Sequence, residues 1–349
     1  MPPPRALLAP AETLLIALAG GTAFTLLGFP AGLVSGSVLA VATAAVLGRP
    51  VRVPVPLARV CYVLVGMLLG AVVTPQTVKG FLTWPASVAL LVVASICMLV
   101  ATASYLRVVH RWDRLSALMG ASPGSMVQVI ALSTELGADL RAVAIVQTVR
   151  VLLLTIGIPA GLALFGLVAP AIPIARGAAP SSPGELAIVV AVSSAVALLV
   201  ARLRFPGGLL FGAMAGSGVL HGTGLVVATL PWWVGGGAVV VLGAVVGSRF
   251  ANTTFRLIVG YLGAALGSFA VSVSIATIFA LIVAHFFPFS IANVVVAFSP
   301  GAQDTMMVLA LALHLDPVYV GAHHLTRFLV VTISVAVGAR KLGKPKPPA

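Results

Sequence analysis

Long apolar runs separated by short polar loops dominate this chain. Apolar runs fall roughly at 13–48, 60–78, 84–106, 142–169, 186–201, 205–248, 257–298 and 317–339, and only 142–169 and 317–339 contain a charged residue, Arg150 and Arg327. One helical crossing of a bilayer needs only ~20 residues, so the longest runs must fold back on themselves. The pattern predicts an all-α polytopic membrane protein.

Turn residues inside the runs divide them further. Ten crossings are expected at roughly 11–29, 31–48, 57–75, 84–106, 141–168, 184–202, 206–226, 231–249, 256–284 and 317–339. Two shorter segments, 114–137 and 288–315, are each interrupted by proline and glycine. They are expected to be re-entrant hairpins or discontinuous helices, because proline cannot continue a helix and glycine permits a reversal.

The two interrupted segments belong to an internal repeat. Ser122-Pro123-Gly124 recurs 177 positions later as Ser299-Pro300-Gly301, and at the same spacing Arg150 matches Arg327. Glycine pairs four apart recur as well, for example Gly66/Gly70 and Gly243/Gly247, and predict close helix packing. The domains expected are a first repeat at 1-170, a linker at 171-183, a second repeat at 184-340 and a basic cytoplasmic tail at 341-349.

The distribution of basic residues bears on how the repeats are oriented. With five crossings in each half the second repeat is inverted, and 16 Lys or Arg residues lie in the cytoplasm against 2 outside. With six crossings in each half the repeats are parallel, and the count becomes 12 against 6. Basic residues favour cytoplasmic loops, so two inverted repeats with both termini in the cytoplasm are favoured. Twelve crossings stay the alternative.

Composition excludes several classes of protein. The chain is 60% hydrophobic and 8% charged, with a mean hydropathy of +1.17, which no soluble domain of this length can bury. The first run lacks the features of a cleaved signal peptide, and the expected location is the bacterial inner membrane. A net charge of +13 suggests nucleic acid, but the basic residues are dispersed over short loops. No specific nucleic-acid partner is therefore expected.

The breaks are the first candidate site. Helices that begin just after Ser122, Pro123 and Gly124, and after Ser299, Pro300 and Gly301, would point free N–H groups at the tip of each segment. Such helix starts bind anions, so all six residues are candidates for substrate binding. The alternative is a proline kink in a structural helix.

Two intramembrane arginines are the second candidate. Arg150 and Arg327 lie some ten residues into their crossings, which is about 15 Å deep at the rise of a helix. An arginine at that depth is costly unless it is paired or hydrated. Either the two arginines cradle an anionic substrate, flanked by Gln147 and His324, or they form structural ion pairs. The ion-pair partners would be Glu135 or Asp139 for the first arginine and Asp304 or Asp316 for the second.

The second half carries two ionisable residues that the first half lacks. Asp304 corresponds to Val127, and His323 corresponds to Val146. Both are candidates for coupling transport to a proton or a sodium ion. The alternatives are that Asp304 caps a helix start and that His323 belongs to a polar packing face. The histidines are too scattered for a metal site, so no metal, cofactor or enzymatic activity is expected.

The repeated block resembles the bacterial membrane AbrB family, also called the AbrB duplication family. The resemblance rests on Ser122-Pro123-Gly124 through Asp139 to Arg150, and on Ser299-Pro300-Gly301 through Asp304 and Asp316-Pro317 to His323-His324 and Arg327. The first copy departs from the family pattern, because Ser125 replaces the second glycine after the proline. The family carries the labels transcriptional regulator and ammonia monooxygenase, and neither label follows from these residues.

The function expected is secondary transport of a small anionic metabolite, with the site formed by broken helices at the membrane midplane. The expected partners are the lipid bilayer, the anion with a proton or sodium ion, and a second copy of the chain in a homodimer. The alternative is a membrane-embedded sensor or regulator of gene expression that acts through protein partners. An intramembrane monooxygenase and a channel are weaker alternatives.

Overall fold

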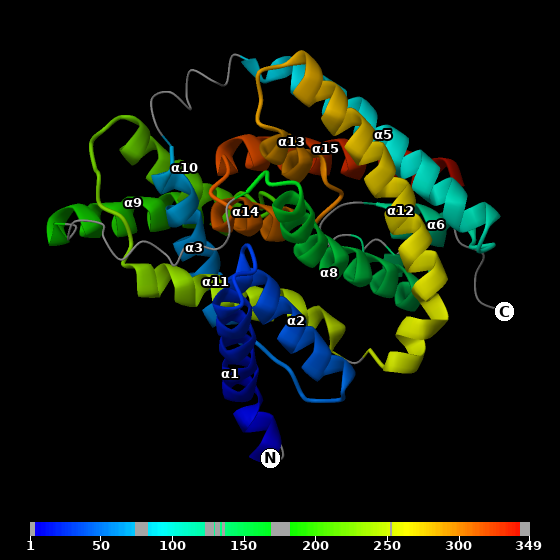
Figure 1. Cartoon of the computed structure of the whole chain (residues 1–349), viewed down its shortest axis with the longest axis horizontal. Coiled ribbons are helices and arrows are strands. Elements are labelled where there is room, and N and C mark those ends of the chain that lie inside the picture. Colours follow the sequence, from blue (N-terminus) through cyan, green and yellow to red (C-terminus); the bar gives the residue numbers. More distant parts are fainter. Residues whose placement is uncertain are drawn as a thin grey trace. The chain divides into compact units, whose positions relative to one another are not determined.

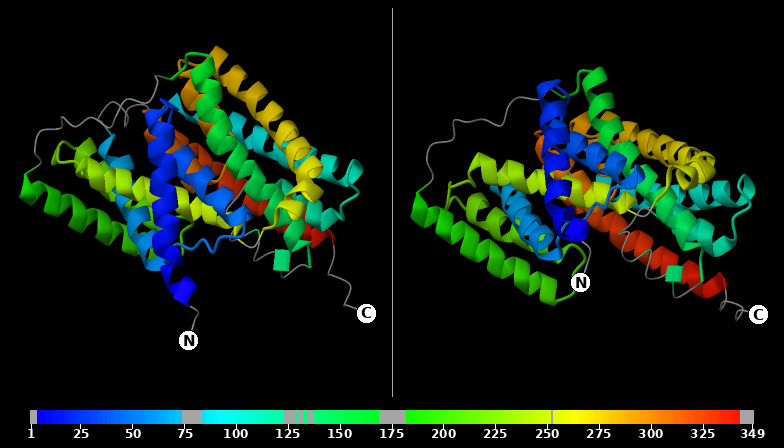
Figure 2. Two further views of the ribbon diagram at one scale, coloured as in Figure 1. Left: turned by 60° about the horizontal axis from the view of Figure 1, so that its bottom comes forward. Right: turned by 90° about the horizontal axis from the view of Figure 1, so that it is seen from below.

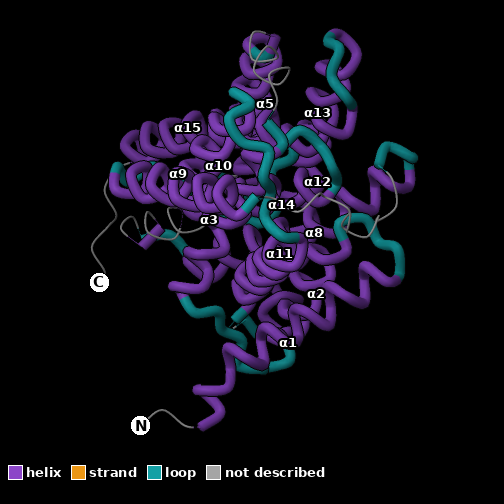
Figure 3. Tube along the Cα trace, turned by 90° about the vertical axis from the view of Figure 1, so that its left-hand side faces the viewer, coloured by secondary structure: helices purple, strands orange, loops and turns teal. Residues whose placement is uncertain are grey.

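The chain is helical wherever its structure is described. The computed structural model describes residues 4–73, 83–122, 129, 133–134, 137–168, 182–251 and 253–342. These residues form helices joined by short loops and contain no strand, as the purple and teal tube shows (Figure 3). The predicted all-α class is confirmed.

The helices separate into two compact units. Unit 1 comprises Met1–Thr83, Thr155–Asn252 and Met307–Val318, and unit 2 comprises Trp84–Leu154, Thr253–Met306 and Tyr319–Ala349. Each unit therefore draws segments from both halves of the chain. The division into two consecutive repeats concerns the sequence, and it stays a prediction.

Unit 1 pairs helices from the first and second halves. Its elements are α1 (Pro4–Leu26), α2 (Gly32–Val46), α3 (Val55–Ala71), α9 (Pro183–Arg202), α10 (Gly208–Gly222), α11 (Trp232–Gly247) and the short 3-10 helix η2 (Ser248–Phe250). Helix α1 packs along α2, as Figure 1 shows in blue, while α10 packs between α3 and α9. Helix α11 packs on α2 and α3.

Local sequence explains where these helices begin. Helices α2 and α10 both follow a Phe-Pro pair, and the residue before each helix is left-handed, with φ 53° at Ala31 and φ 65° at Gly207. Proline ends the preceding helix, and the left-handed residue reverses the chain. Helix α9 begins with Pro183 after Ser182, whose hydroxyl accepts a hydrogen bond from the Glu185 N–H.

Glycines let the helices of unit 1 approach closely, as the sequence predicts. A methyl group at Gly66 or Gly70 would collide with the backbone of α10. A methyl group at Gly243 or Gly247 would collide with α2. Because no side chain stands between them at these positions, the backbones of the paired helices approach closely and make van der Waals contact.

Unit 2 is built from longer helices and from the two interrupted segments. Its elements are α5 (Pro85–Val108), α6 (Arg114–Ala121), the first part of α8 (Leu140–Leu164), α12 (Phe255–Phe286), α13 (Ile291–Phe298), the start of α14 (Gln303–Ala312) and most of α15 (Pro317–Leu342). Helix α12 runs beside α5, in yellow and cyan (Figure 2). The Asp113 carboxylate starts α6 by accepting from the N–H groups of Leu115 and Ser116.

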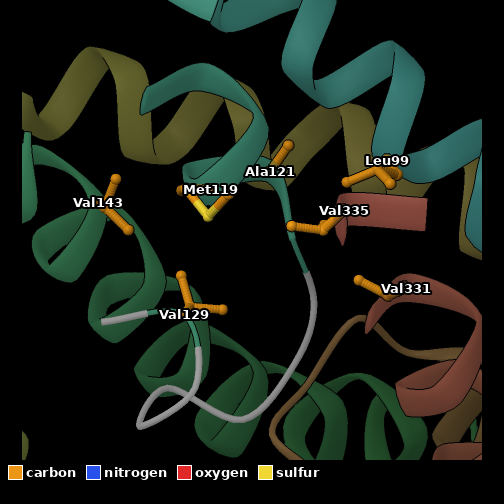
Figure 4. Packing of buried hydrophobic residues seen from close by; sticks show 7 residues of the cluster. All are labelled: Leu99, Met119, Ala121, Val129, Val143, Val331 and Val335. Carbon is orange, nitrogen blue, oxygen red and sulfur yellow. The ribbon is translucent and has the colours of Figure 1, made fainter. Parts of the chain in front are cut away.

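An apolar cluster holds the helices of unit 2 together around the first interrupted segment. Figure 4 shows Met119 and Ala121 of α6 beside side chains from α5, α8 and α15. The buried members are Leu99, Met119, Ala121, Val129, Val143, Val331 and Val335. Close packing of these side chains fixes the end of α6 against α8, where the candidate site lies.

Seven of the described helices are long and apolar enough to cross a membrane: α1, α5, α8, α9, α11, α12 and α15. The chain is a multi-pass membrane protein. Helices α2 and α10 have 15 residues and α3 has 17, which is about 22–26 Å at the rise of a helix and short of the ~30 Å hydrocarbon core. Three of the ten predicted crossings are therefore too short to qualify by length, and the count of ten stays a prediction.

Candidate functional site

Both interrupted segments end their first helix at the serine that precedes proline. Helix α6 ends at Ala121 and Ser122 is extended, with φ −65° and ψ 112°. Helix α13 ends at Phe298 and Ser299 is extended, with φ −60° and ψ 138°. A residue before proline is driven out of the helical region by contact with the ring, so the sequence sets both ends locally.

The helix after the break is described in the second half only. Residues Ser299 to Ala302 separate α13 from α14 and are buried, Pro300 and Gly301 included. The predicted discontinuity is therefore present there, while re-entry into a membrane stays a prediction. Pro123 and Gly124 lie outside the described residues.

Arg150 lies against the carboxyl end of α6. Its NH2 group donates to the Ser122 carbonyl at 3.0 Å, and NH1 makes a weaker 3.5 Å contact with the Ala121 carbonyl. One turn earlier on α8, the Gln147 amide donates to the Met119 carbonyl at 3.0 Å. The arginine is only 3% exposed. The cation thus donates to carbonyl groups at the end of α6 that lack helical partners, and the amide adds a second donor to the Met119 carbonyl, which also accepts from the Ser122 N–H.

Arg327 makes an equivalent contact with the serine carbonyl in the second half and adds one with the glycine of the break. Its NH1 group donates to the Ser299 carbonyl and NH2 donates to the Gly301 carbonyl at 3.0 Å. His324 contacts the Val296 carbonyl through Nε2 at 3.0 Å. Each of the pairs 119/296, 122/299, 147/324 and 150/327 is separated by 177 positions. These contacts follow the 177-position spacing of the sequence repeat, while the duplication of the structure and its inverted orientation stay predictions.

The contacts of His324 define its tautomer. Its Nδ1 atom faces NH2 of Arg327, which can only donate, so Nδ1 accepts. Its Nε2 atom faces a carbonyl oxygen, which can only accept, so Nε2 carries the proton. His324 is therefore a neutral bridge between the end of α13 and Arg327.

The ion pairs considered for the two arginines are not found in the described part of the chain. Neither guanidinium pairs there with a carboxylate. Asp139 instead accepts from the N–H groups of Arg141 and Ala142 at the start of α8. Asp316 and Asp304 accept from backbone N–H groups at the starts of α15 and α14. Carboxylates occupy helix starts and the arginines occupy helix ends, as the helix dipole favours. Glu135 lies outside the described residues.

Each arginine keeps an unused donor. Among the described residues, Nε of Arg150 and Nε of Arg327 are buried without a hydrogen-bond partner. Both guanidinium groups are buried, with Arg150 3% and Arg327 2% exposed. Two desolvated cations without a counter-charge are costly, and a buried donor without an acceptor adds to the cost. Each guanidinium is thus suited to an anion that accepts from its free Nε donor.

The remaining predicted residues of the second break already have partners within the protein. The Ser299 hydroxyl donates to the Val296 carbonyl at 2.7 Å. The Asp304 carboxylate accepts from the Thr305 N–H and so occupies one of the free donors at the start of α14. An anion at this break therefore depends on the arginine more than on the helix start, which the sequence did not anticipate.

His323 forms a separate polar contact on the other side of α15. Its Nε2 atom lies 2.9 Å from the Ser87 hydroxyl of α5, and its Nδ1 donates to the Tyr319 carbonyl. The Tyr319 ring lies 4.0 Å away between centroids, and the Phe298 ring 5.9 Å away. Sequence reasoning missed Ser87, because an isolated serine in an apolar run carries no distinguishing pattern. Within the described residues no group of three His, Cys, Asp or Glu side chains is placed to hold a metal ion.

Comparison with known proteins agrees with this picture. The chain is 27% identical over 265 residues to the uncharacterized protein YhjN of Bacillus subtilis (strain 168), covering 70% of this chain and 68% of that protein. The family model described as transition state regulatory protein AbrB matches residues 33–343. This match spans nearly the whole chain, including both breaks and both buried arginines, and the chain belongs to the AbrB family.

Proposed function

We propose that this chain is a secondary carrier for a small anionic metabolite, and not an enzyme. The observation that carries the proposal is the pair of buried arginines at the helix ends before the breaks. Each is held by backbone carbonyls, each keeps a buried Nε donor without a partner among the described residues, and neither is neutralised there by a carboxylate.

An anion would resolve both physical costs of this arrangement. Its negative charge would offset the cost of burying Arg150 and Arg327, and its oxygens would accept from the unused N–H groups. Both arginines belong to unit 2, which combines helices from the two halves. Carriers with repeated halves place their substrate where discontinuous helices from the two repeats meet, which is the analogy that supports transport over permanent binding.

The proposal also includes the membrane in which the carrier lies and the ion to which transport is coupled. The carrier would lie in the bacterial inner membrane with both termini in the cytoplasm, because that orientation leaves most basic residues inside. Asp304 and His323 would couple transport to a proton or sodium ion, and two copies could associate as a homodimer. The basic residues lie in short loops, so we propose no specific nucleic-acid partner.

The description of the matching family favours one second candidate, a membrane regulator that acts through a protein partner. Transport by the purified protein separates the two functions, since a carrier moves its solute without any partner.

The test begins with the purified full-length protein and a panel of small anions that includes acetate, succinate, phosphate and sulfate. A ligand that binds only the folded state raises the melting temperature. The anion with the largest shift is then supplied, in labelled form, to liposomes that contain the protein. We expect uptake by the wild type, and loss of uptake in Arg150→Lys and Arg327→Lys because a point charge cannot replace the planar fork.

Arg202→Lys is the matched control, because this exposed arginine ends α9 in the other unit. It is expected to transport as the wild type does. The carrier proposal is rejected if no anion shifts the melting temperature and the liposomes stay impermeable to every anion in the panel. Unchanged uptake in both buried variants would show that the arginines are purely structural.

A further inference from the structure

We infer that the two arginines are not equivalent: Arg150 binds an oxyanion with two parallel hydrogen bonds, while His324 blocks the same edge of Arg327. Arg327 then contributes its charge and, on this edge, the Nε donor alone. This inference rests on the proposed function and identifies the chemical class of its substrate, a carboxylate or phosphate group that presents two oxygens to one guanidinium.

The count of donors separates the two arginines. A guanidinium has five N–H donors. In the described part of the chain, Arg150 uses one N–H of NH1 and one of NH2. Arg327 uses one N–H of NH1 and both of NH2, because NH2 donates to the Gly301 carbonyl and to His324. Arg150 therefore keeps three unused donors and Arg327 keeps two.

The edge of the guanidinium matters more than the count. Carboxylates and phosphates accept best from two neighbouring N–H groups of one edge, for example Nε and NH2. Arg150 retains its Nε donor and one donor of NH2, which make such an edge available. Arg327 retains its Nε donor, but its NH2 group has none left. Two parallel bonds along this edge are available at Arg150 alone.

The residue one turn before each arginine produces this difference. Gln147 donates to the Met119 carbonyl and forms no hydrogen bond to Arg150 within the described residues. His324 holds the matching carbonyl of Val296 through one ring nitrogen and accepts from Arg327 through the other. A neutral imidazole has one donor nitrogen and one acceptor nitrogen, so His324 bridges the Val296 carbonyl and the Arg327 guanidinium. Gln147 and His324 are thus the residues that decide which arginine binds the anion.

Chemical modification of the full-length protein in liposomes tests this inference without a known substrate. Phenylglyoxal adds its two carbonyl carbons to the terminal nitrogens NH1 and NH2 of one guanidinium, so its yield falls where both N–H groups of NH2 are already engaged, as they are in Arg327. Peptide mass spectrometry then gives the adduct yield at each arginine. We expect the yield at Arg150 to exceed that at Arg327 by roughly tenfold, the effect of about one hydrogen bond to a charged group.

Exchanging the residue types at positions 147 and 324 provides matched variants. His324→Gln retains a donor for the Val296 carbonyl and frees NH2 of Arg327, so the adduct at Arg327 should rise toward that at Arg150. Gln147→His should lower the adduct at Arg150. Acetate or phosphate should protect Arg150 from the reagent in the wild type, and the more protective anion identifies the class of substrate.

Three results would overturn the inference: equal or greater modification at Arg327 in the wild type, exchanges that leave both yields unchanged, or no protection by either anion. The absence of an adduct at both arginines would also overturn it if neither acetate nor phosphate raises the melting temperature. The proposed function has a separate readout. A protein that carries an anion in liposomes yet shows equal modification at both arginines retains the function and loses the asymmetry.

Discussion

Each buried arginine lies at a helix end where the sequence stops the helix. Proline moves Ser122 and Ser299 out of the helical region, which leaves carbonyl groups of α6 and α13 without partners. Arg150 donates to the carbonyl of Ser122, and Arg327 donates to the carbonyl of Ser299, the residues that directly follow these helices. The positive charge of each arginine also interacts favourably with the negative, carboxyl-terminal end of the helix dipole. A capping role and an anion-binding role are therefore compatible in one side chain, because capping leaves donors unused.

Ser87 offers a prediction about the contact of His323. Ser87→Ala removes the hydroxyl 2.9 Å from Nε2 of a fully buried imidazole, which leaves that nitrogen without a partner. The expected loss of stability is about 1–3 kcal/mol, read as a lower melting temperature in detergent. Ser95→Ala is the control, since Ser95 is equally buried on α5 and donates to the Leu91 carbonyl of its own helix. Equal melting temperatures for the two variants would contradict the prediction.

Asp304 offers a prediction about ion coupling. Asp304→Asn keeps an oxygen that can accept from the Thr305 N–H, but removes the charge. If the carboxylate binds the coupling ion, the variant folds and binds the anion, while uptake into liposomes no longer responds to an imposed proton or sodium gradient. Asp316→Asn is the control, because Asp316 also accepts from a backbone N–H at a helix start. A gradient response in Asp304→Asn equal to that of the wild type would show that Asp304 is not the coupling residue.

Different residue types determine where the helices of this protein end and how closely they approach one another. Proline and capping residues set where α6, α9 and α13 begin or end. Glycine sets how closely α3 approaches α10. The short helices of unit 1 depend on these close contacts, because a helix that falls short of the ~30 Å hydrocarbon core gains less from lipid than a full crossing does.

Gly70 gives a test of helix contact. Gly70→Ala places a methyl group against the Met214 carbonyl and the Gly218 N–H of α10, so α3 and α10 must separate. We expect a lower melting temperature and a lower yield of folded protein, with a cost of about 1–3 kcal/mol for overpacking. Gly237→Ala on α11 has nothing within 4 Å of its added methyl group and should be neutral or slightly stabilising. A Gly70→Ala variant as stable as Gly237→Ala would mean that the two helices are not closely packed.

At the scale of the whole molecule, the compact units do not follow the order of the sequence. Unit 1 combines α1, α2 and α3 with α9, α10 and α11. Unit 2 combines the interrupted segments and the arginine-bearing helices of both halves. Arg150 and Arg327, which are 177 positions apart in the sequence, therefore lie in the same unit.

Membrane topology is the prediction at this scale. The count of basic residues predicts that Arg111 and Arg202 face the cytoplasm, while Lys79 and Arg176, which lie outside the described residues, face the periplasm. Each is replaced with cysteine in a protein lacking Cys61 and Cys97, and intact cells are treated with an impermeant thiol reagent. Labelling is expected at positions 79 and 176 only, and at all four positions after permeabilisation. Labelling of position 202 without 176 in intact cells would favour parallel repeats.

The sequence by itself determined the helical class, the membrane environment, most helix boundaries and the two residues at which the interrupted segments leave the helix. These follow from hydrophobic runs, prolines and caps, which act over a few residues. The sequence also identified both buried arginines and their flanking Gln147 and His324, because each pair recurs at the 177-position spacing of the repeat.

Only the tertiary structure decided which groups these residues touch. The Arg150 and Arg327 contacts with helix ends join residues 28 positions apart, and the Ser87 contact with His323 joins residues 236 positions apart. Carboxylates at several positions were equally plausible partners by spacing alone, yet packing places them at helix starts. Helix packing sets distance and direction between groups remote in the chain, so the unused donors, the bridge through His324 and the mixing of both halves in each unit have no counterpart in local pattern.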